Sequence, residues 1–239
     1  MTANYKIPFI VHQTFYTTKL PPQIINIIQH NKILNPNVKF IFYNDDECER
    51  FIKTYFNNKI YNAYMMINSC YGAMRADFFR YCVLYKIGGI YLDIKSKINI
   101  PLTKIITEDD CCILDIQRNN LEPWRKYVPT YEQWVLIFKP YHPYLNEMIN
   151  QMVTNIENKY QPTIPGYAIL NSKQKILQLT GPDALTRAIN TCINNNIINH
   201  RNIDYYKYFT LAPFKNYQSM YISKKHYSQY NEPLYKPIL

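Results

Sequence analysis

The chain has 239 residues, of which 47% are hydrophobic and 18% are charged. These values are typical of a globular protein, so we expect residues 1–239 to form a single domain. The 27 basic and 17 acidic residues give a formal net charge of +10, which favours anionic ligands without choosing among them. The sequence has neither the ~20 consecutive apolar residues of a membrane span nor a signal-peptide pattern. We therefore expect a soluble, intracellular protein with no transmembrane segment.

The N-terminal part alternates predicted strands and helices. Residues 7–12 and 39–43 are apolar and β-prone, which predicts two buried strands. Between them, residues 22–33 begin with proline and form an amphipathic helical pattern. Asn44 predicts an N-cap for an acidic helix over residues 45–56. This alternation favours an α/β fold with a parallel, Rossmann-like sheet flanked by helices.

The remaining part predicts further strands and helices at wider spacing. Residues 111–115 and 134–138 are predicted strands, and residues 143–157 begin with proline and predict an amphipathic helix. Residues 161–177 are ambiguous, so we expect a loop with a short strand. A Gly-Pro pair begins a predicted helix over residues 181–195. We expect the aromatic C-terminal tail to belong to the same domain and to fold back over the site.

The most informative stretch of the chain is ADFFRYCVLYKIGGIYLD. Asp77 and Arg80 are three residues apart on a predicted helix, so their side chains face the same way. The Gly-Gly pair ends that helix, and a short apolar strand follows and ends at Asp93. Ligands of open α/β sheets bind beyond the carboxyl ends of the strands. The stretch therefore predicts a site for a polyhydroxylated, phosphorylated ligand.

These residues resemble glycosyltransferase family 32, the group of the yeast initiating α-1,6-mannosyltransferase, which is similar at the donor site to glucosylating bacterial toxins. The shared pattern is Asp-x-x-Arg, a Gly-Gly turn and Tyr-x-Asp-x-Asp, which appears here as Asp77, Arg80, Gly88, Gly89, Tyr91 and Asp93. The segments IPFIVHQTF, NPNVKFIFYNDDECERFI and LTGPDALTRAI match in the same order. The resemblance implies a GT-A-type nucleotide-sugar-binding fold with a mostly parallel sheet. It also implies a retaining transferase that moves a hexose from a UDP- or GDP-sugar to an acceptor hydroxyl on a glycan or protein.

The resemblance assigns the predicted catalytic residues. Asp77 would accept hydrogen bonds from the donor sugar hydroxyls, and Arg80 would contact the sugar and the diphosphate, to which its planar fork of donors is suited. Asp93 would contact the donor ribose and a divalent cation. Further donor-binding residues are predicted around these three: His12, Gln13, Phe15, Tyr91, Lys95, Thr180 and Gly181. For Phe15 and Tyr91, packing in the core is the alternative, and for Thr180 and Gly181 it is an ordinary capped helix.

The sequence departs from the usual Asp-x-Asp motif because it reads Asp93-Ile94-Lys95. A protonated lysine cannot ligate a cation. One interpretation is that the Lys95 ammonium pairs with the diphosphate and partly replaces the metal. The preferred interpretation is that Lys95 points away and that Mn²⁺ (or Mg²⁺) is held by Asp93, the diphosphate, waters and His226 of the tail. A third is that catalysis is weak or lost.

Two other functions compete with a transferase. A catalytically weak nucleotide-sugar-binding pseudoenzyme would also explain Lys95, and it would bind a donor without transferring it. A basic nucleic-acid-binding protein would explain the charge of +10 and the 24 tyrosines. The sequence contains no zinc finger, RNP-type aromatic block or basic repeat, so we expect no nucleic acid partner. Duplex binding that falls steeply with salt would indicate otherwise.

Overall fold

The structure is a computed structural model that describes residues 4–117, 129–164, 169–197, 199–214 and 230–236. Its α-helices are α1 (Pro22–Leu34), α2 (Asp45–Tyr55), α3 (Asn58–Met66), α4 (Gly72–Ile87), α5 (Pro143–Glu157), α6 (Ser172–Leu179) and α7 (Pro182–Asn194). Its strands are β1 (Ile10–Thr14), β2 (Lys39–Tyr43), β3 (Gly89–Leu92), β4 (Ser96–Ile98), β5 (Cys112–Leu114), β6 (Ile116–Gln117), β7 (Thr130–Tyr131), β8 (Val135–Phe138), β9 (Arg201–Asn202) and β10 (Phe209–Leu211).

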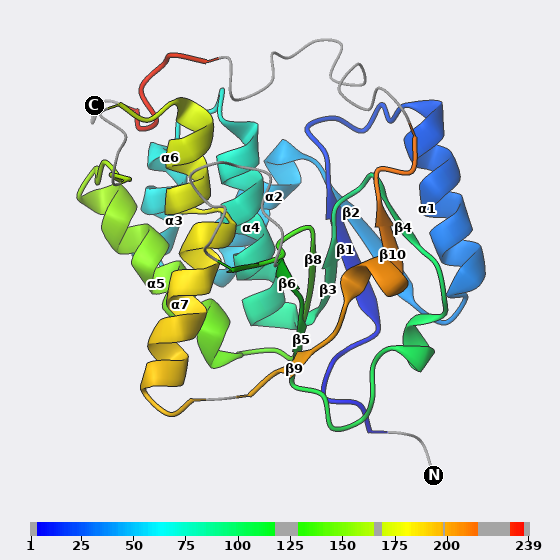
Figure 1. Ribbon diagram of the computed structural model, residues 1–239. Helices are drawn as coiled ribbons and strands as arrows, with labels where there is room; N and C mark the ends of the chain where they lie inside the picture. The colour runs from blue at the N-terminus through cyan, green and yellow to red at the C-terminus, as the bar shows by residue number, and fades with distance from the viewer. Residues whose placement is uncertain (1–3, 118–128, 165–168, 198, 215–229, 237–239) are drawn as a thin grey trace.

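The centre of the fold is a six-stranded sheet with the order β2-β1-β3-β8-β5-β9. Strand β8 runs antiparallel to both of its neighbours, whereas the other neighbouring pairs are parallel. Helices α2 to α7 lie on one side of the sheet, and α1 lies on the other side next to the small β10-β4 sheet (Figure 1). The sheet is therefore mostly parallel and flanked by helices, which confirms the predicted fold class.

The two faces of the sheet pack into two separate hydrophobic clusters. Leu136 and Phe138 of β8 belong to the larger cluster, which also contains the buried side chains of α4, α5 and α7. Val135 and Ile137 of the same strand belong to the second cluster, together with Ile90 of β3. Successive side chains of a strand point to opposite faces, so a strand buried on both faces reads as a continuous apolar run. This is why these strands were predictable from apolar runs.

The helix α6 contradicts the prediction of a loop with a short strand for residues 161–177. Asn171 accepts a hydrogen bond from the Gln174 backbone N–H, and the Gln174 side chain accepts one from the Asn171 N–H. This capping box satisfies two amides that the first turn of a helix leaves open. Ile176 and Leu179 then bury the inner face of the helix. The Asn-x-x-Gln spacing was the sequence signal that could have predicted it.

The C-terminal part of the chain is attached at two separate places. Strand β10 pairs with β4, which begins three residues after Asp93. Residues 230–236 instead lie against the α3–α4 connection, where Asn68 donates to the Leu234 carbonyl at 2.8 Å and Lys236 donates to the Met66 carbonyl at 2.8 Å. Within the ranges described above, none of the helices has both the length and the hydropathy needed to cross a bilayer.

The turn between α4 and β3 depends on two glycines with positive φ angles, Gly88 at 73° and Gly89 at 98°. A Cβ atom on Gly89 would lie 2.4 Å from the backbone oxygen of Ile10. Both the backbone angle and the close approach of β1 therefore require glycine at this position. The turn sets the direction of β3, and with it the position of Asp93.

Replacing Gly89 with alanine is expected to destabilise the protein by at least ~2 kcal/mol, because the variant must strain its φ angle and displace β1. Chemical denaturation measures this free energy of unfolding. Gly72→Ala is the matched control, since a Cβ there meets no atom within 4 Å and alanine favours a helix. Equal stability of the two variants would contradict this account of the turn.

Candidate functional site

The candidate site lies where the carboxyl ends of β1 and β3 meet the residues that precede β8. Strands β1 and β3 are parallel neighbours, so their carboxyl ends share one edge of the sheet. Because β8 is antiparallel to β3, the segment before β8 reaches the same edge. There the Asp93 backbone N–H donates to the Trp134 carbonyl at 2.8 Å. The antiparallel strand therefore adds residues 133–134 to the end of β3.

Three of the predicted residues form a connected ion cluster at this edge. The Arg80 Nη2 atom lies 3.2 Å from Asp77 Oδ1 and 3.5 Å from Asp93 Oδ1. Asp77 and Arg80 are one turn apart on α4, as predicted, and their side chains are only about one-tenth exposed. The Asp93 side chain is 26% exposed. The cluster thus runs from a buried carboxylate, through a buried cation, to a carboxylate that solvent or a ligand can reach.

The Arg80 guanidinium is fixed by further contacts. Its Nη1 donates to the Gln133 carbonyl at 2.8 Å, and its central carbon lies 4.5 Å from the centre of the Tyr91 ring. Burial opposes the charge, but Tyr91, Asp77 and Asp93 outweigh burial and raise the pKa of Arg80, so this side chain stays a cation. Among the described residues, its Nε atom is buried without a hydrogen-bond partner. Arg80 therefore orients Asp93 and keeps one donor uncommitted.

Asp77 lies at the buried end of the cluster. The Thr180 hydroxyl donates to Asp77 Oδ2 at 2.9 Å, and Gln133 donates at 3.2 Å to the Thr180 carbonyl. Burial raises the pKa of the Asp77 carboxyl from 3.8 to about 7, although Arg80 and Thr180 both act to lower it. The protonation of Asp77 therefore changes near neutral pH.

The raised pKa of Asp77 predicts a pH-dependent stability. A native carboxyl that holds its proton more tightly than the unfolded chain stabilises the fold at low pH. That contribution is complete below about pH 4 and is lost as the pH rises to about 7. Relative to the wild type, Asp77→Asn should therefore gain stability progressively from pH 4 to pH 7. Denaturation across this range measures the difference, and an unchanging difference would contradict the prediction.

A matched variant controls for the loss of a carboxyl. Asp109→Asn removes a fully exposed carboxyl near Lys6, and its difference from the wild type should not follow the Asp77 curve. His12 and His142, whose pKa values burial lowers to about 4, also titrate within this range. They are present in all three proteins, so they cancel in the comparison.

Asp93 and Lys95 lie in the turn between β3 and β4. The Ser96 N–H donates to the Asp93 carbonyl at 2.8 Å, which closes this turn. Ile94 is buried with Phe15 and Ile24, whereas Lys95 is half-buried. The site thus presents one partly exposed carboxylate, Asp93, which contacts Arg80, and Lys95 follows it two residues later in the chain.

We tested whether the described residues fit a divalent cation. They contain no group of three or more His, Cys, Asp or Glu side chains arranged to hold a metal. Asp93 is the exposed carboxylate of the ion cluster, and a cation such as Mg²⁺ is commonly held by one or two carboxylates together with substrate phosphates. The residues therefore fit a cation that arrives with a diphosphate. His226, the other predicted ligand, lies outside the described residues.

The predicted base-binding residues after the first strand have different surroundings. The ring nitrogens of His12 lie 3.2 Å from the Tyr43 hydroxyl and 3.0 Å from the Gly88 carbonyl, so both are engaged inside the fold. Gln13 is buried, and within the described structure its Nε2 atom has no hydrogen-bond partner. Phe15 is buried against Ile94, beside Asp93. Of these two polar residues, Gln13 is therefore the one that keeps a side-chain donor unengaged.

Thr180 and Gly181 join the site in a different way from the prediction. Both of their backbone N–H groups donate to the Ile176 carbonyl at the end of α6, at 2.9 and 3.0 Å. They are therefore not open to an anion, and Thr180 reaches the site through its hydroxyl. A Cβ on Gly181 would lie 2.6 Å from the Leu177 Cα atom, so glycine permits the close contact between α6 and α7.

Sequence reasoning missed one residue of the site, Gln133. Gln133 contacts both Arg80 and Thr180, as described above. Thr14, at the end of β1, lies with its hydroxyl 2.8 Å from the Tyr91 hydroxyl and so connects β1 to the site. The predicted strand over residues 134–138 places Gln133 just before the start of a strand. The sequence does not show that this strand pairs antiparallel with β3, and this pairing is what brings Gln133 to the carboxyl end of β3.

Comparison with known families identifies a match over residues 21–112, which include the ion cluster. The matching family is described as "Glycosyltransferase sugar-binding region containing DXD motif". Over 103 residues the chain is 33% identical to inositol phosphoceramide mannosyltransferase 3 of Schizosaccharomyces pombe, covering 42% of the chain and 27% of that protein. It is 26% identical to the putative glycosyltransferase HOC1 of Saccharomyces cerevisiae, covering 81% and 51%. An initiation-specific alpha-1,6-mannosyltransferase of S. pombe is 24% identical, covering 81% and 52%.

The chain thus spans about half the length of the latter two relatives. Among solved structures, the PaToxG glycosyltransferase superposes with a TM-score of 0.56 at 14% identity, covering 80% of this chain and 73% of that one. The UDP-bound glycosyltransferase domain of the YGT toxin gives a TM-score of 0.56 at 10% identity, covering 85% and 81%. The sequence matches confirm the predicted resemblance, and the structural matches confirm the fold.

Proposed function

We propose, from the match of residues 21–112 to the family described as a glycosyltransferase sugar-binding region with a DXD motif, that the chain transfers a hexose from a nucleoside diphosphate sugar to an acceptor hydroxyl on a glycan or protein. The observation that carries the proposal is the position of Asp93. Its carboxylate is partly exposed at the carboxyl end of β3 and is bridged by Arg80 to the buried Asp77. A ligand that binds at this edge of the sheet would contact the Asp93 carboxylate. Lys95 follows two residues later in the chain, and the Asp77–Arg80 pair of α4 lies behind Asp93.

The proposed roles follow the arrangement of the cluster. Asp93 binds hydroxyls of the donor, and Arg80 fixes the position of Asp93 and supplies positive charge behind it. Asp77 anchors Arg80 and reaches the sugar hydroxyls when the donor binds. Lys95 lies two residues beyond Asp93 and supplies a second positive charge. Fixed charges of this kind stabilise a departing anion without reorganising.

We propose that transfer retains the configuration of the anomeric carbon. The bond between that carbon and the diphosphate oxygen breaks, and a bond to the acceptor oxygen forms on the same face. The acceptor proton passes to the departing diphosphate. The ion cluster offers no second exposed carboxylate beside Asp93 to act as a nucleophile, which supports this front-face route. Measuring the anomeric coupling constant of the product by NMR distinguishes retention from inversion.

A divalent cation, Mn²⁺ or Mg²⁺, is part of the proposal. When bound, it would act as a Lewis acid that neutralises charge on the leaving diphosphate. Asp93 is the described residue placed to hold it together with the diphosphate, and His226 remains a proposed ligand.

Replacing Lys95 with aspartate tests this arrangement. Lys95→Asp removes a positive charge and adds a carboxylate two residues from Asp93. We expect the Mn²⁺ concentration needed for half-maximal binding of the nucleoside diphosphate to fall at least tenfold, because like charge no longer opposes the cation. Titrating Mn²⁺ while following nucleotide binding by calorimetry measures it. An unchanged Mn²⁺ requirement would contradict the placement of Lys95 near the cation.

The donor is best identified by binding. We propose GDP-mannose or a UDP-hexose, since curated relatives are named as mannosyltransferases and a structural neighbour was solved with UDP. The melting temperature should be measured with each donor, with Mn²⁺ and with EDTA. A bound donor at a hundredfold excess over its Kd stabilises by about 2.7 kcal/mol.

Activity is then measured as release of the nucleoside diphosphate with a panel of saccharide acceptors and water. A shift and release with one donor, with the release strongly reduced in Asp93→Asn but not in Asp109→Asn, would support the proposal. Binding without release would indicate a pseudoenzyme, and no shift with any donor would overturn the proposal.

A further inference from the structure

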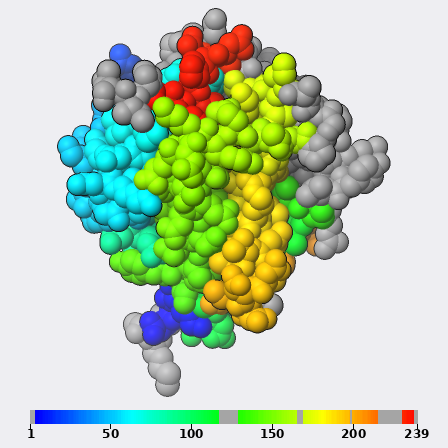
Figure 2. All heavy atoms as spheres, turned by 90° about the vertical axis from the view of Figure 1, so that its left-hand side faces the viewer, coloured from blue at the N-terminus to red at the C-terminus, as the bar shows by residue number. Residues whose placement is uncertain are grey.

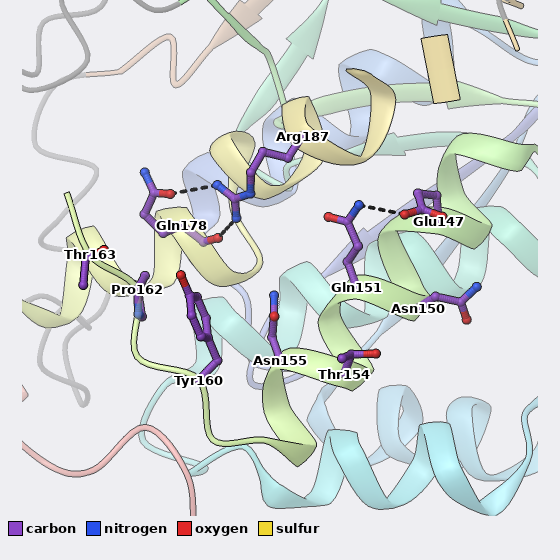
Figure 3. A pocket seen from close by; sticks show the side chains of 10 residues that line it. All are labelled: Glu147, Asn150, Gln151, Thr154, Asn155, Tyr160, Pro162, Thr163, Gln178 and Arg187. Carbon is purple, nitrogen blue, oxygen red and sulfur yellow. Dashed lines mark hydrogen bonds between the residues drawn. The ribbon is translucent and has the colours of Figure 1, made fainter. Parts of the chain in front are cut away.

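A polar cavity of about 550 Å³ lies between α5, the segment that follows it, and the α6–α7 pair. Figure 2 shows this face of the molecule, where α5 runs between the α2–α3 region and the α6–α7 pair. Figure 3 shows side chains of α5 on one side, Tyr160 below, and Gln178 with Arg187 opposite. None of the residues that line the cavity belongs to the ion cluster. Its volume is within the range of about 300–1,000 Å³ that small-molecule sites occupy.

The chemistry of the lining is neutral and rich in hydrogen-bonding groups. Four carboxamide side chains face the cavity: Asn150, Gln151, Asn155 and Gln178. Two threonines and the Tyr160 phenol add hydroxyl groups, and the charged residues are a single glutamate and a single arginine, which balance each other. A phosphate or a basic peptide would find no excess of opposite charge there. Amides both donate and accept hydrogen bonds, which suits a ligand that carries many neutral hydroxyl groups.

Part of this lining is already held in place. The Gln151 amide donates to Glu147 at 2.8 Å, and the Gln178 carboxamide oxygen accepts from Arg187 at 2.8 Å. In the described part of the chain, no side-chain hydrogen bond engages the amides of Asn150 and Asn155. The cavity therefore combines fixed polar groups with amides that are open to a ligand.

Tyr160 supplies an aromatic surface next to these amides. Its backbone N–H donates to the Asn155 carbonyl at 2.8 Å, and its carbonyl accepts from the Tyr235 hydroxyl at 3.1 Å. The side chain itself is 46% exposed. The residue is thus anchored by its backbone, and its ring stands at the edge of the cavity (Figure 3). An exposed ring of this kind gives the apolar face of a pyranose a surface to pack on, while the amides bind its hydroxyls.

We propose that this cavity is a second saccharide site, which binds a neutral oligosaccharide separately from the nucleotide-sugar site. The α6–α7 connection joins the two regions. Gln178 faces the cavity, and Thr180, two residues later, donates to Asp77. If the proposed transferase function holds, the cavity binds a part of the acceptor glycan away from the reacting hydroxyl.

The test is saturation-transfer NMR on the full chain without any nucleotide sugar. The probes are mannotriose, maltotriose, cellotriose and chitotriose. We expect at least one of them to bind, and Tyr160→Ala and Asn155→Ala each to weaken it at least tenfold. Tyr141→Ala removes another exposed tyrosine, outside the cavity, and Asp93→Asn alters the nucleotide-sugar site. Both should leave the binding unchanged.

Absence of binding by all four trisaccharides would overturn the proposal, and so would binding that persists in both cavity variants. Binding that Asp93→Asn abolishes would place the saccharide at the ion cluster and would also overturn it. Melting temperatures of the variants show that each is folded. Because no nucleotide is present, this site can fail while donor binding succeeds, and the two proposals are tested separately.

Discussion

Arg80→Met is expected to destabilise the protein by about 3–5 kcal/mol and to abolish transfer. The guanidinium bridges Asp77 at 3.2 Å and Asp93 at 3.5 Å and donates to the Gln133 carbonyl. Above pH 7, where the Asp77 carboxyl is ionised in the folded protein, removing Arg80 leaves this buried carboxylate without its cation, and removing one partner of a buried ion pair costs this much because the other charge stays desolvated. It also frees Asp93 from its orientation. Chemical denaturation gives the stability, and nucleoside diphosphate release gives the activity.

Arg75→Met is the matched control for this variant. Arg75 lies on the same helix, pairs with Glu49 at 3.2 Å and stacks on Tyr64. Glu49 is about one-third exposed, so water can solvate it when Arg75 is lost, and the destabilisation should be smaller. Activity should persist because Arg75 is not part of the ion cluster.

The combined variant Asp77→Asn with Arg80→Met separates charge from packing. Its stability should exceed that of Arg80→Met alone, because it removes the buried carboxylate that Arg80→Met leaves unpaired. If the combined variant is no more stable, the charge pair is not what stabilises this region.

The part of the site that was predictable is the part built by local structure. Asp77 and Arg80 are one turn apart on a helix that the sequence predicted, and spacing alone places them on one side. The Gly-Gly pair adopts the positive φ angles that end the helix. Asn44 caps α2 with a full capping box, as its position before an acidic turn predicted. Each of these features involves residues that are only a few positions apart in the sequence, so residue propensity and spacing are sufficient to predict it.

The part that was not predictable depends on contacts between distant segments. Gln133 reaches Arg80 because β8 enters the sheet antiparallel to β3, and the alternation of strands and helices predicts only parallel neighbours. Thr180 was predicted as a donor-binding residue before a helix, and the structure shows that its N–H donates to the Ile176 carbonyl and its hydroxyl donates to Asp77. The direction of a side chain at a helix junction follows from packing. The catalytic, donor-binding and metal-binding roles of all the predicted site residues stay predictions.

Asp93→Asn is expected to lower the rate of transfer roughly 10²-fold or more while changing stability by less than about 1 kcal/mol. The two effects separate because of where Asp93 lies. Its side chain is 26% exposed and 3.5 Å from Arg80, so water compensates for most of the lost ion pair in the folded protein. Its shape is kept by asparagine, and its backbone N–H still donates to the Trp134 carbonyl at 2.8 Å. Asp93→Asn therefore removes mainly the negative charge that the carboxylate offers to the donor, so we expect it to lower the rate of transfer more than the stability.

The measurement compares single-turnover transfer and donor Kd for the wild type, Asp93→Asn and Asp109→Asn. A lower rate with a nearly unchanged Kd would mean that the carboxylate acts mainly in the transition state. A Kd raised in proportion, with the rate at saturation unchanged, would mean that it only holds the donor. Asp109→Asn should match the wild type in both values. Full activity in Asp93→Asn would remove Asp93 from the proposed reaction and leave Arg80 and Lys95 as the proposed charged residues of the site.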